Sequence, residues 1–126
     1  MKRLLVVEDD AAIREMMRRR LAMRGFDVRV AGEGPAAIAA VHEHRPEALL
    51  LDIELPGGMN GWEVIRVLRD DPRTAGIQVF VLTAHVTPAD VDRAARMGCP
   101  RFFGKPVDFR SLVEALGGEP ARAVAG

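Results

Sequence analysis

The sequence predicts an α/β domain in which five parallel strands form one doubly wound sheet with helices on both faces. The expected strands are short apolar runs, and the central ones lack alternation, as is typical of strands buried on both faces. The segments between them carry apolar residues at helical spacing. Because each strand is followed by a helix, right-handed crossovers restrict the sheet to a few topologies.

The expected elements follow from these patterns in chain order. Strands are expected at residues 4–7, 28–31, 48–51, 77–82 and 101–103. The second helix begins after the turn at residues 32–35, and glycines 25, 98 and 117 follow the ends of the first, fourth and fifth helices. The apolar stripes of the other helices are Ile13, Met16, Met17 and Leu21; Val64, Val67 and Leu68; Val91, Ala94 and Ala95; and Phe109, Leu112, Val113 and Leu116.

Composition excludes several classes of protein. The 126 residues suit a single domain, and 48% hydrophobic with 29% charged residues excludes a mostly disordered chain. Eighteen basic residues balance eighteen acidic ones, so no bulk charge attracts the domain to nucleic acid or to an anionic membrane. No apolar run approaches the roughly 20 residues that cross a bilayer. We expect a cytoplasmic protein.

The first residues and the lone cysteine agree with that location. The apolar start is followed at once by three acidic residues at 8–10, which a secretory signal does not tolerate. A single cysteine, Cys99, forms no internal disulfide, and we expect it to be a small core residue.

Polar residues that can do chemistry stand where the predicted strands end. In an open parallel sheet, ligands bind beyond the carboxyl ends of the strands. If the first and third strands are neighbours, three or four carboxylates meet at one edge of the sheet. The residues in question are Glu8, Asp9 and Asp10 after the first strand, Asp52 after the third, Thr83 after the fourth and Lys105 after the fifth.

Such a cluster of carboxylates would repel itself unless a cation balanced it. Mg²⁺ prefers oxygen ligands and usually combines a few carboxylates with waters and a phosphate. A lysine and a threonine hydroxyl then suit the recognition of phosphoryl oxygens, and Asp52 is the best-placed carboxylate to act as a nucleophile. Each acid alone could instead be a solvated strand end, but that interpretation does not explain the whole set.

The chain resembles the receiver domain of two-component response regulators, of which the chemotaxis receivers are an example. The resemblance covers residues 3–116 and rests on four motifs in the family's order and spacing. They are Leu5-Val6-Val7-Glu8-Asp9-Asp10, Leu51-Asp52-Ile53-Glu54-Leu55-Pro56, Leu82-Thr83-Ala84 and Gly104-Lys105-Pro106. The resemblance implies a flavodoxin-like (βα)5 fold with strand order 2-1-3-4-5. Residues 1–117 would form the domain, and 118–126 a flexible tail or the stub of a linker.

The resemblance also implies a role for each residue of the site. Asp52 corresponds to the phosphoacceptor, and Lys105 to the residue that forms a salt bridge with the phosphoryl group. The metal ligands would be Glu8, Asp9, Asp52 and the backbone carbonyl of Glu54, directly or through water. Thr83 corresponds to the switch hydroxyl and Phe102 to the switch aromatic residue. The peptide bond before Pro106 is expected to be cis.

Function and partners follow from the same resemblance. A histidine kinase or a phosphotransfer protein would donate a phosphoryl group to Asp52 with Mg²⁺. Thr83 and Phe102 would then move, and the face formed by the fourth helix, the fifth strand and the fifth helix would change its affinity for a downstream protein. We expect no enzyme beyond self-phosphorylation and dephosphorylation, no DNA or membrane binding by this domain, and a monomer or weak homodimer.

Three features depart from the typical pattern of the family. The loop at residues 55–61 is one residue longer than usual, with adjacent glycines 57 and 58 and Asn60 where an aspartate is common. This insertion is either neutral or a site of kinase docking. Phe102 lacks the hydroxyl of a tyrosine, which favours an inward position. Glu54 and His85 each lie two residues beyond a site residue, and we hypothesise that they tune the phosphoryl lifetime; the alternative is two solvated side chains.

Other residues admit simpler interpretations. The arginines 18–20 form a solvated helix face or a kinase contact, and His42 and His44 are expected to be solvated. Trp62 packs near the start of the third helix or anchors a partner. Two other functions compete. A small aspartyl phosphatase would need an aspartate where Glu54 stands, together with a cap segment. An unphosphorylated interaction domain of the same fold would leave the set of Asp52, Thr83 and Lys105 unexplained.

Overall fold

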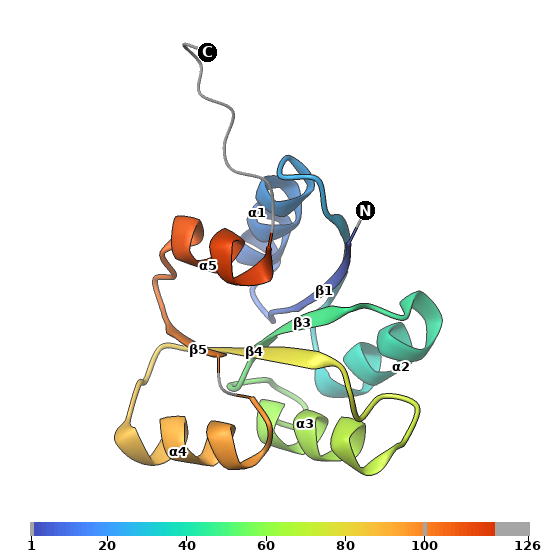
Figure 1. Cartoon of the computed structure of the whole chain (residues 1–126), viewed down its shortest axis with the longest axis vertical. Helices are drawn as coiled ribbons and strands as arrows, with labels where there is room; N and C mark the ends of the chain where they lie inside the picture. Colours follow the sequence, from blue (N-terminus) through green and yellow to red (C-terminus); the bar gives the residue numbers. More distant parts are fainter. Residues whose placement is uncertain (1, 100, 118–126) are drawn as a thin grey trace.

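The computed structural model describes residues 2–99 and 101–117, which form one five-stranded parallel sheet with helices on both faces (Figure 1). The strand order is β2-β1-β3-β4-β5, as expected. Every strand boundary lies within one residue of the one expected. The strands are β1 (Arg3–Val7), β2 (Asp27–Ala31), β3 (Ala48–Asp52), β4 (Gln78–Thr83) and β5 (Arg101–Gly104).

The five helices alternate with the strands along the chain. In Figure 1, α1 and α5 cover one face of the sheet, while α2, α3 and α4 cover the other. The helices are α1 (Ala11–Ala22), α2 (Gly34–His44), α3 (Gly61–Asp70), α4 (Pro88–Arg96) and α5 (Phe109–Leu116). The expected tail at 118–126 lies outside the described residues.

The sheet divides the apolar interior into two cores because successive strand residues point to opposite faces. Leu50 of β3 and Phe80 of β4 pack with Leu112 of α5 on one face. Leu49 and Leu51 of β3 pack with the helices of the other face. Every residue of β3 is buried, which explains its run of three leucines.

Helix α1 buries only half of its predicted apolar stripe. Met17 and Leu21 are buried, whereas Ile13 and Met16 are 39% and 42% exposed. The same correction applies to Val67 of α3 and Val91 of α4, which are exposed. Helical spacing places apolar residues on one side of a helix, but it does not show how far the neighbouring elements extend over that side.

Polar side chains cap the helices that begin near the strand ends. Asp10 accepts a hydrogen bond from the backbone N–H of Ile13 and thereby caps α1. Asn60 and Glu63 form a reciprocal capping box at the start of α3. The unusual Asn60 of the longer loop therefore has a local structural role, and the adjacent glycines Gly57 and Gly58 both adopt positive φ angles.

Several smaller expectations can also be compared with the structure. Cys99 is fully buried, and Trp62 is buried with the Arg93 guanidinium 4.5 Å from its ring centroid. His42 and His44 are half-buried rather than solvated, because α2 packs beside α3 and β2. Within residues 2–99 and 101–117, no helix has the length and apolar character needed to cross a bilayer.

Candidate functional site

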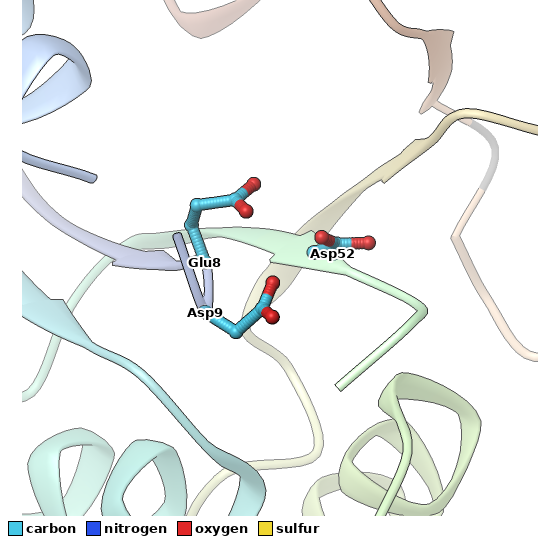
Figure 2. Close-up of side chains that lie close together, drawn as sticks. All are labelled: Glu8, Asp9 and Asp52. Atoms are coloured by element: carbon cyan, nitrogen blue, oxygen red, sulfur yellow. The ribbon is translucent and has the colours of Figure 1, made fainter. Parts of the chain in front are cut away.

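Three carboxylates converge at the carboxyl ends of β1 and β3, which are neighbours in the sheet. Glu8 and Asp9 follow β1 directly, and Asp52 is the last residue of β3. One carboxylate oxygen from each residue lies within 4.8 Å of the others. In Figure 2 the Asp9 side chain is directed from the β1 end toward Asp52. The expected convergence of distant residues at one sheet edge is therefore present.

Lys105 completes the cluster from the loop after β5. Its Nζ donates to Glu8 Oε2 at 2.7 Å and to Asp52 Oδ2 at 2.8 Å. The peptide bond between Lys105 and Pro106 is cis, as expected, and the Lys105 backbone N–H donates to the Thr83 carbonyl at 2.8 Å. The Lys105 amine thus links the side chains at the ends of β1 and β3. Lys105 itself follows β5, which lies on the other side of β4 in the sheet.

Asp52 is buried, and both of its carboxylate oxygens have a hydrogen-bond donor. Its Oδ2 accepts from Lys105, and its Oδ1 accepts from the backbone N–H of Glu54 at 3.0 Å. Its own backbone belongs to the β3–β4 ladder. The carboxylate is therefore held in one orientation, which suits a group that must meet an incoming reactant.

Glu8 is a buried acid of the cluster, and its pKa is shifted. Only 3% of its surface is exposed, and this burial raises the pKa of its carboxyl, although hydrogen bonds from Lys105 and from the Asp10 N–H oppose the shift. Burial also disfavours the charge of Lys105, but its hydrogen bonds to Asp52 and Glu8 outweigh this effect and raise the pKa of the amine. The ammonium is therefore a fixed positive charge between two acids.

The remaining acids of the run after β1 have separate roles. Asp9 is exposed, whereas the side chain of Asp10 is engaged in capping α1. Of the three or four carboxylates expected, three therefore meet. Their charges exceed the single charge of Lys105, and hard oxygen donors in this number fit a Mg²⁺ ion that keeps part of its water shell.

Thr83 and the two candidate lifetime residues lie at the neighbouring strand end. Thr83, the last residue of β4, is buried, and its Oγ1 accepts from the backbone N–H of His85 at 3.1 Å. The exposed imidazole of His85 lies with Nε2 3.7 Å from Oε1 of Glu54. Phe102 pairs with Val81 across the β4–β5 ladder and is half-buried against the core beneath α2, α3 and α4.

A groove of about 540 Å³ opens beside the cluster, between α1 and the segment after β5. The exposed apolar residues of α1, Ile13 and Met16, line it together with Pro106 and Val107. Glu8 and Lys105 form part of its wall, so the groove reaches the acidic cluster.

Arg14 of α1 was not predicted as a site residue, yet it contacts the loop that carries two of the acids. Its Nη1 donates to the backbone carbonyl of Glu8 at 2.9 Å and lies 3.4 Å from that of Asp9. Contacts to backbone carbonyls leave no signature in side-chain spacing, and sequence reasoning therefore had no signal for this residue.

The fold and the carboxylate cluster define a doubly wound α/β protein with an acidic, lysine-containing site at its strand ends. The family model of the response regulator receiver domain matches residues 4–117. The chain belongs to this family.

Relatives and solved structures agree with that assignment. The chain is 43% identical over 112 residues to the DNA-binding response regulator MtrA of Mycolicibacterium paratuberculosis; the match covers 89% of this chain and 48% of MtrA, so the chain spans about half of that protein. It is 30% identical to the polar-differentiation response regulator DivK of Brucella anthropi, over 91% of this chain and 93% of DivK. The chemotaxis protein CheY4 of Vibrio cholerae superposes with a TM-score of 0.86 at 25% identity, over 93% and 97% of the two chains.

Proposed function

We propose that this domain is a signalling switch that accepts a phosphoryl group on Asp52 from a histidine kinase or a histidine phosphotransfer protein. The observation that carries the proposal is the arrangement of Asp52, Asp9 and Lys105. A buried carboxylate with a fixed orientation stands between an ammonium group and an exposed second acid. A carboxylate placed in this way can act as a nucleophile.

The proposed reaction transfers a phosphoryl group from nitrogen to oxygen. A carboxylate oxygen of Asp52 attacks the phosphorus, the bond from phosphorus to the donor histidine nitrogen breaks, and the departing nitrogen keeps the electron pair. Lys105 is placed to neutralise charge on the phosphoryl oxygens, and the N–H of Glu54 keeps the carboxylate oriented. The product is a mixed anhydride that water can hydrolyse.

The cofactor proposed for this step is Mg²⁺. Asp9, Asp52 and the backbone carbonyl of Glu54 would hold it, with Glu8 acting directly or through water. When bound, the ion supplies positive charge to the phosphoryl oxygens. The excess of carboxylates over ammonium groups and the exposure of Asp9 support this assignment.

The proposed output is a change in the face formed by α4, β5 and α5. Phosphorylation adds charge and acceptor oxygens beside Thr83. The Thr83 hydroxyl would exchange its contact with the His85 N–H for a phosphoryl oxygen, and Phe102 would move with it. A downstream protein would bind the altered face with a different affinity, so the domain would act through protein binding rather than as an enzyme.

The donor is proposed to dock over α1. The groove beside Lys105 is apolar along Ile13, Met16 and Val107, and it leads to the acidic cluster. The arginines 18–20 extend the same helix and would contact the acidic side chains of such a partner.

Glu54 and His85 are proposed to tune the lifetime of the phosphorylated state. The separation of 3.7 Å between them supports a shared role at the edge of the site. In the parent protein and in the variants Glu54→Ala and His85→Ala, the decay of the phosphorylated protein measures this role. Altered decay rates are expected, and unchanged rates in both variants would contradict it.

Incubation with a small phosphodonor and Mg²⁺ tests the proposed function. Intact-mass spectrometry should show one phosphoryl group per chain, which is absent without Mg²⁺ and absent from Asp52→Asn. Continuous turnover of the donor with no stable adduct would indicate a phosphatase. Neither adduct nor turnover would indicate an interaction domain that is not phosphorylated.

A further inference from the structure

We infer that Arg14 is a positioning residue for metal binding: its guanidinium holds the loop after β1 in the conformation that presents Glu8 and Asp9. This inference rests on the Mg²⁺ site proposed above and adds a residue outside the acidic cluster to it.

Three parts of the chain meet at the Arg14 guanidinium. Nη1 donates to the carbonyl of Glu8 at 2.9 Å and lies 3.4 Å from that of Asp9, so one nitrogen contacts the backbone of both acidic residues. The backbone N–H of Glu8 donates to Ala31 at the end of β2. The loop is thus fixed from α1 on one side and from β2 on the other.

Gly32, which follows β2, leaves room for this guanidinium. A Cβ at residue 32 would lie 2.8 Å from Arg14 Nη1 and 3.6 Å from its Cζ. The φ angle of Gly32 lies outside the positive range that favours glycine, so the backbone itself would accept an alanine. An alanine at this position would therefore displace the end of the Arg14 side chain.

The location of Arg14 in α1 does not stabilise the helix electrostatically. Arg14 is the fourth residue of α1, whose first turn holds no acidic residue. A positive charge near a helix N-terminus is unfavourable because that end of the macrodipole is already positive. Two carbonyl oxygens of the acidic loop provide the compensating contacts.

Charge and positioning predict opposite effects when Arg14 is replaced. Removing a positive charge beside an acidic pocket makes the pocket more negative, so charge alone predicts tighter binding of Mg²⁺. Loss of a group that orients ligands predicts weaker binding, and outer partners of metal ligands commonly contribute about 10–100-fold in affinity. The direction of the change in Mg²⁺ affinity therefore distinguishes the charge effect from the positioning effect.

Calorimetric titration with Mg²⁺ alone provides the test, using the full chain and the variants Arg14→Met, Arg14→Lys and Gly32→Ala. We expect Arg14→Met to weaken Mg²⁺ binding by about tenfold and Arg14→Lys to restore part of the loss. Gly32→Ala keeps the arginine but displaces it, and it should weaken binding as well. The control Arg29→Ala removes an exposed positive charge from β2 and should not weaken binding.

A double-mutant cycle isolates the contact between the two residues. If Gly32→Ala acts by displacing Arg14, it should cause little further loss of Mg²⁺ affinity in an Arg14→Ala background. Thermal unfolding without metal reports on the fold of each variant, and Gly32→Ala remains informative if replacements of Arg14 do not fold. Unchanged or tighter Mg²⁺ binding in folded Arg14→Met or Gly32→Ala would overturn the inference. A parent protein that binds no Mg²⁺ would instead refute the proposed function.

Discussion

The carboxyl of Glu8 is buried in the site, although burial disfavours its charged form. Burial raises the pKa of this carboxyl despite its hydrogen bond with Lys105. A carboxyl whose pKa is higher in the folded than in the unfolded state stabilises the fold at low pH and loses that contribution as the pH rises. At neutral pH, ionised Glu8 therefore costs stability that its hydrogen bonds offset in part, and a cation in the pocket would offset it further.

Glu8→Gln should consequently stabilise the metal-free protein and impair metal binding. The midpoint of thermal unfolding at neutral pH should rise in the absence of Mg²⁺, because an uncharged amide replaces a buried charge. The stabilisation that added Mg²⁺ provides should shrink. The difference from the parent should also fade as the pH falls through the raised pKa of Glu8, and it should be gone below the ordinary glutamate pKa of 4.5. The exposed residue Glu114 of α5 offers the control Glu114→Gln, and a metal-free Glu8→Gln less stable than the parent would contradict the prediction.

Asp71, just after α3, lies outside the site and makes the stability of the fold depend on pH. Hydrogen bonds from the side chain and backbone of Arg73 lower the pKa of its carboxyl from 3.8 to about 2. Because the folded-state pKa is depressed, this contribution to stability is present above pH 3.8 and is lost as the pH falls toward 2.

NMR titration of the Asp71 carboxyl in the folded protein measures this directly. The midpoint should lie near 2 in the parent and should move upward toward 3.8 in Arg73→Ala, because the largest cause of the shift is removed. A midpoint that Arg73→Ala does not move would show that the hydrogen bonds are not its cause.

Among the elements, the junction between β3 and α3 packs closely against the backbone of Asp52. A Cβ at Gly61 would lie 2.6 Å from the Cα of Ile53 and 2.7 Å from the carbonyl oxygen of Asp52. The Gly61 N–H also donates to the Ile53 carbonyl at 2.8 Å. The first residue of α3 thus packs directly on the backbone that ends β3.

Gly61→Ala should therefore destabilise the protein and disturb the site together. Overpacking of this kind costs about 1–3 kcal/mol, and here the atoms that must move are backbone atoms beside Asp52. Denaturant unfolding and Mg²⁺ titration measure the two effects. In Gly76→Ala, by contrast, the new methyl group meets open space, and stability should change by no more than about 0.5 kcal/mol. Equal stability of the two variants would contradict this account of the junction.

The helices and strands could be predicted well from the sequence because the residue patterns that mark them are local in the chain. Runs of apolar residues such as Leu49 to Leu51 mark strands, and glycines such as Gly98 and Gly117 mark helix ends, through short-range physics. The exposure of Ile13 and Met16 could not be predicted, since it depends on how far the segment after β5 reaches across α1.

For the whole molecule, the sheet order explains why residues far apart in the sequence meet. Adjacent parallel strands β1 and β3 end at the same edge, and Lys105 reaches across from β5. The residue types and strand-end positions made the cluster of Glu8, Asp9 and Asp52 predictable. The capping role of Asp10 and the backbone contacts of Arg14 depend on three-dimensional detail that spacing does not encode.

Transmission from the site to the face of α4, β5 and α5 should depend on Thr83. Thr83→Ala removes the proposed switch hydroxyl but leaves Asp52, Lys105 and the acids in place, so the variant should still gain a phosphoryl group. NMR spectra of the parent should change over α4 and around Phe102 on phosphorylation, and these changes should be largely lost in Thr83→Ala. A variant with the full response would show that the hydroxyl is not the link.

The central claim is that the pocket of Asp9, Asp52 and Lys105 directs a phosphoryl group to one carboxylate. Borohydride reduction of the phosphorylated protein, followed by peptide mass spectrometry, marks the residue that carried the acyl phosphate. The account predicts a mark at position 52 that requires Mg²⁺ during phosphorylation. A mark at another acidic residue, or none after demonstrated exposure to donor and Mg²⁺, would contradict it.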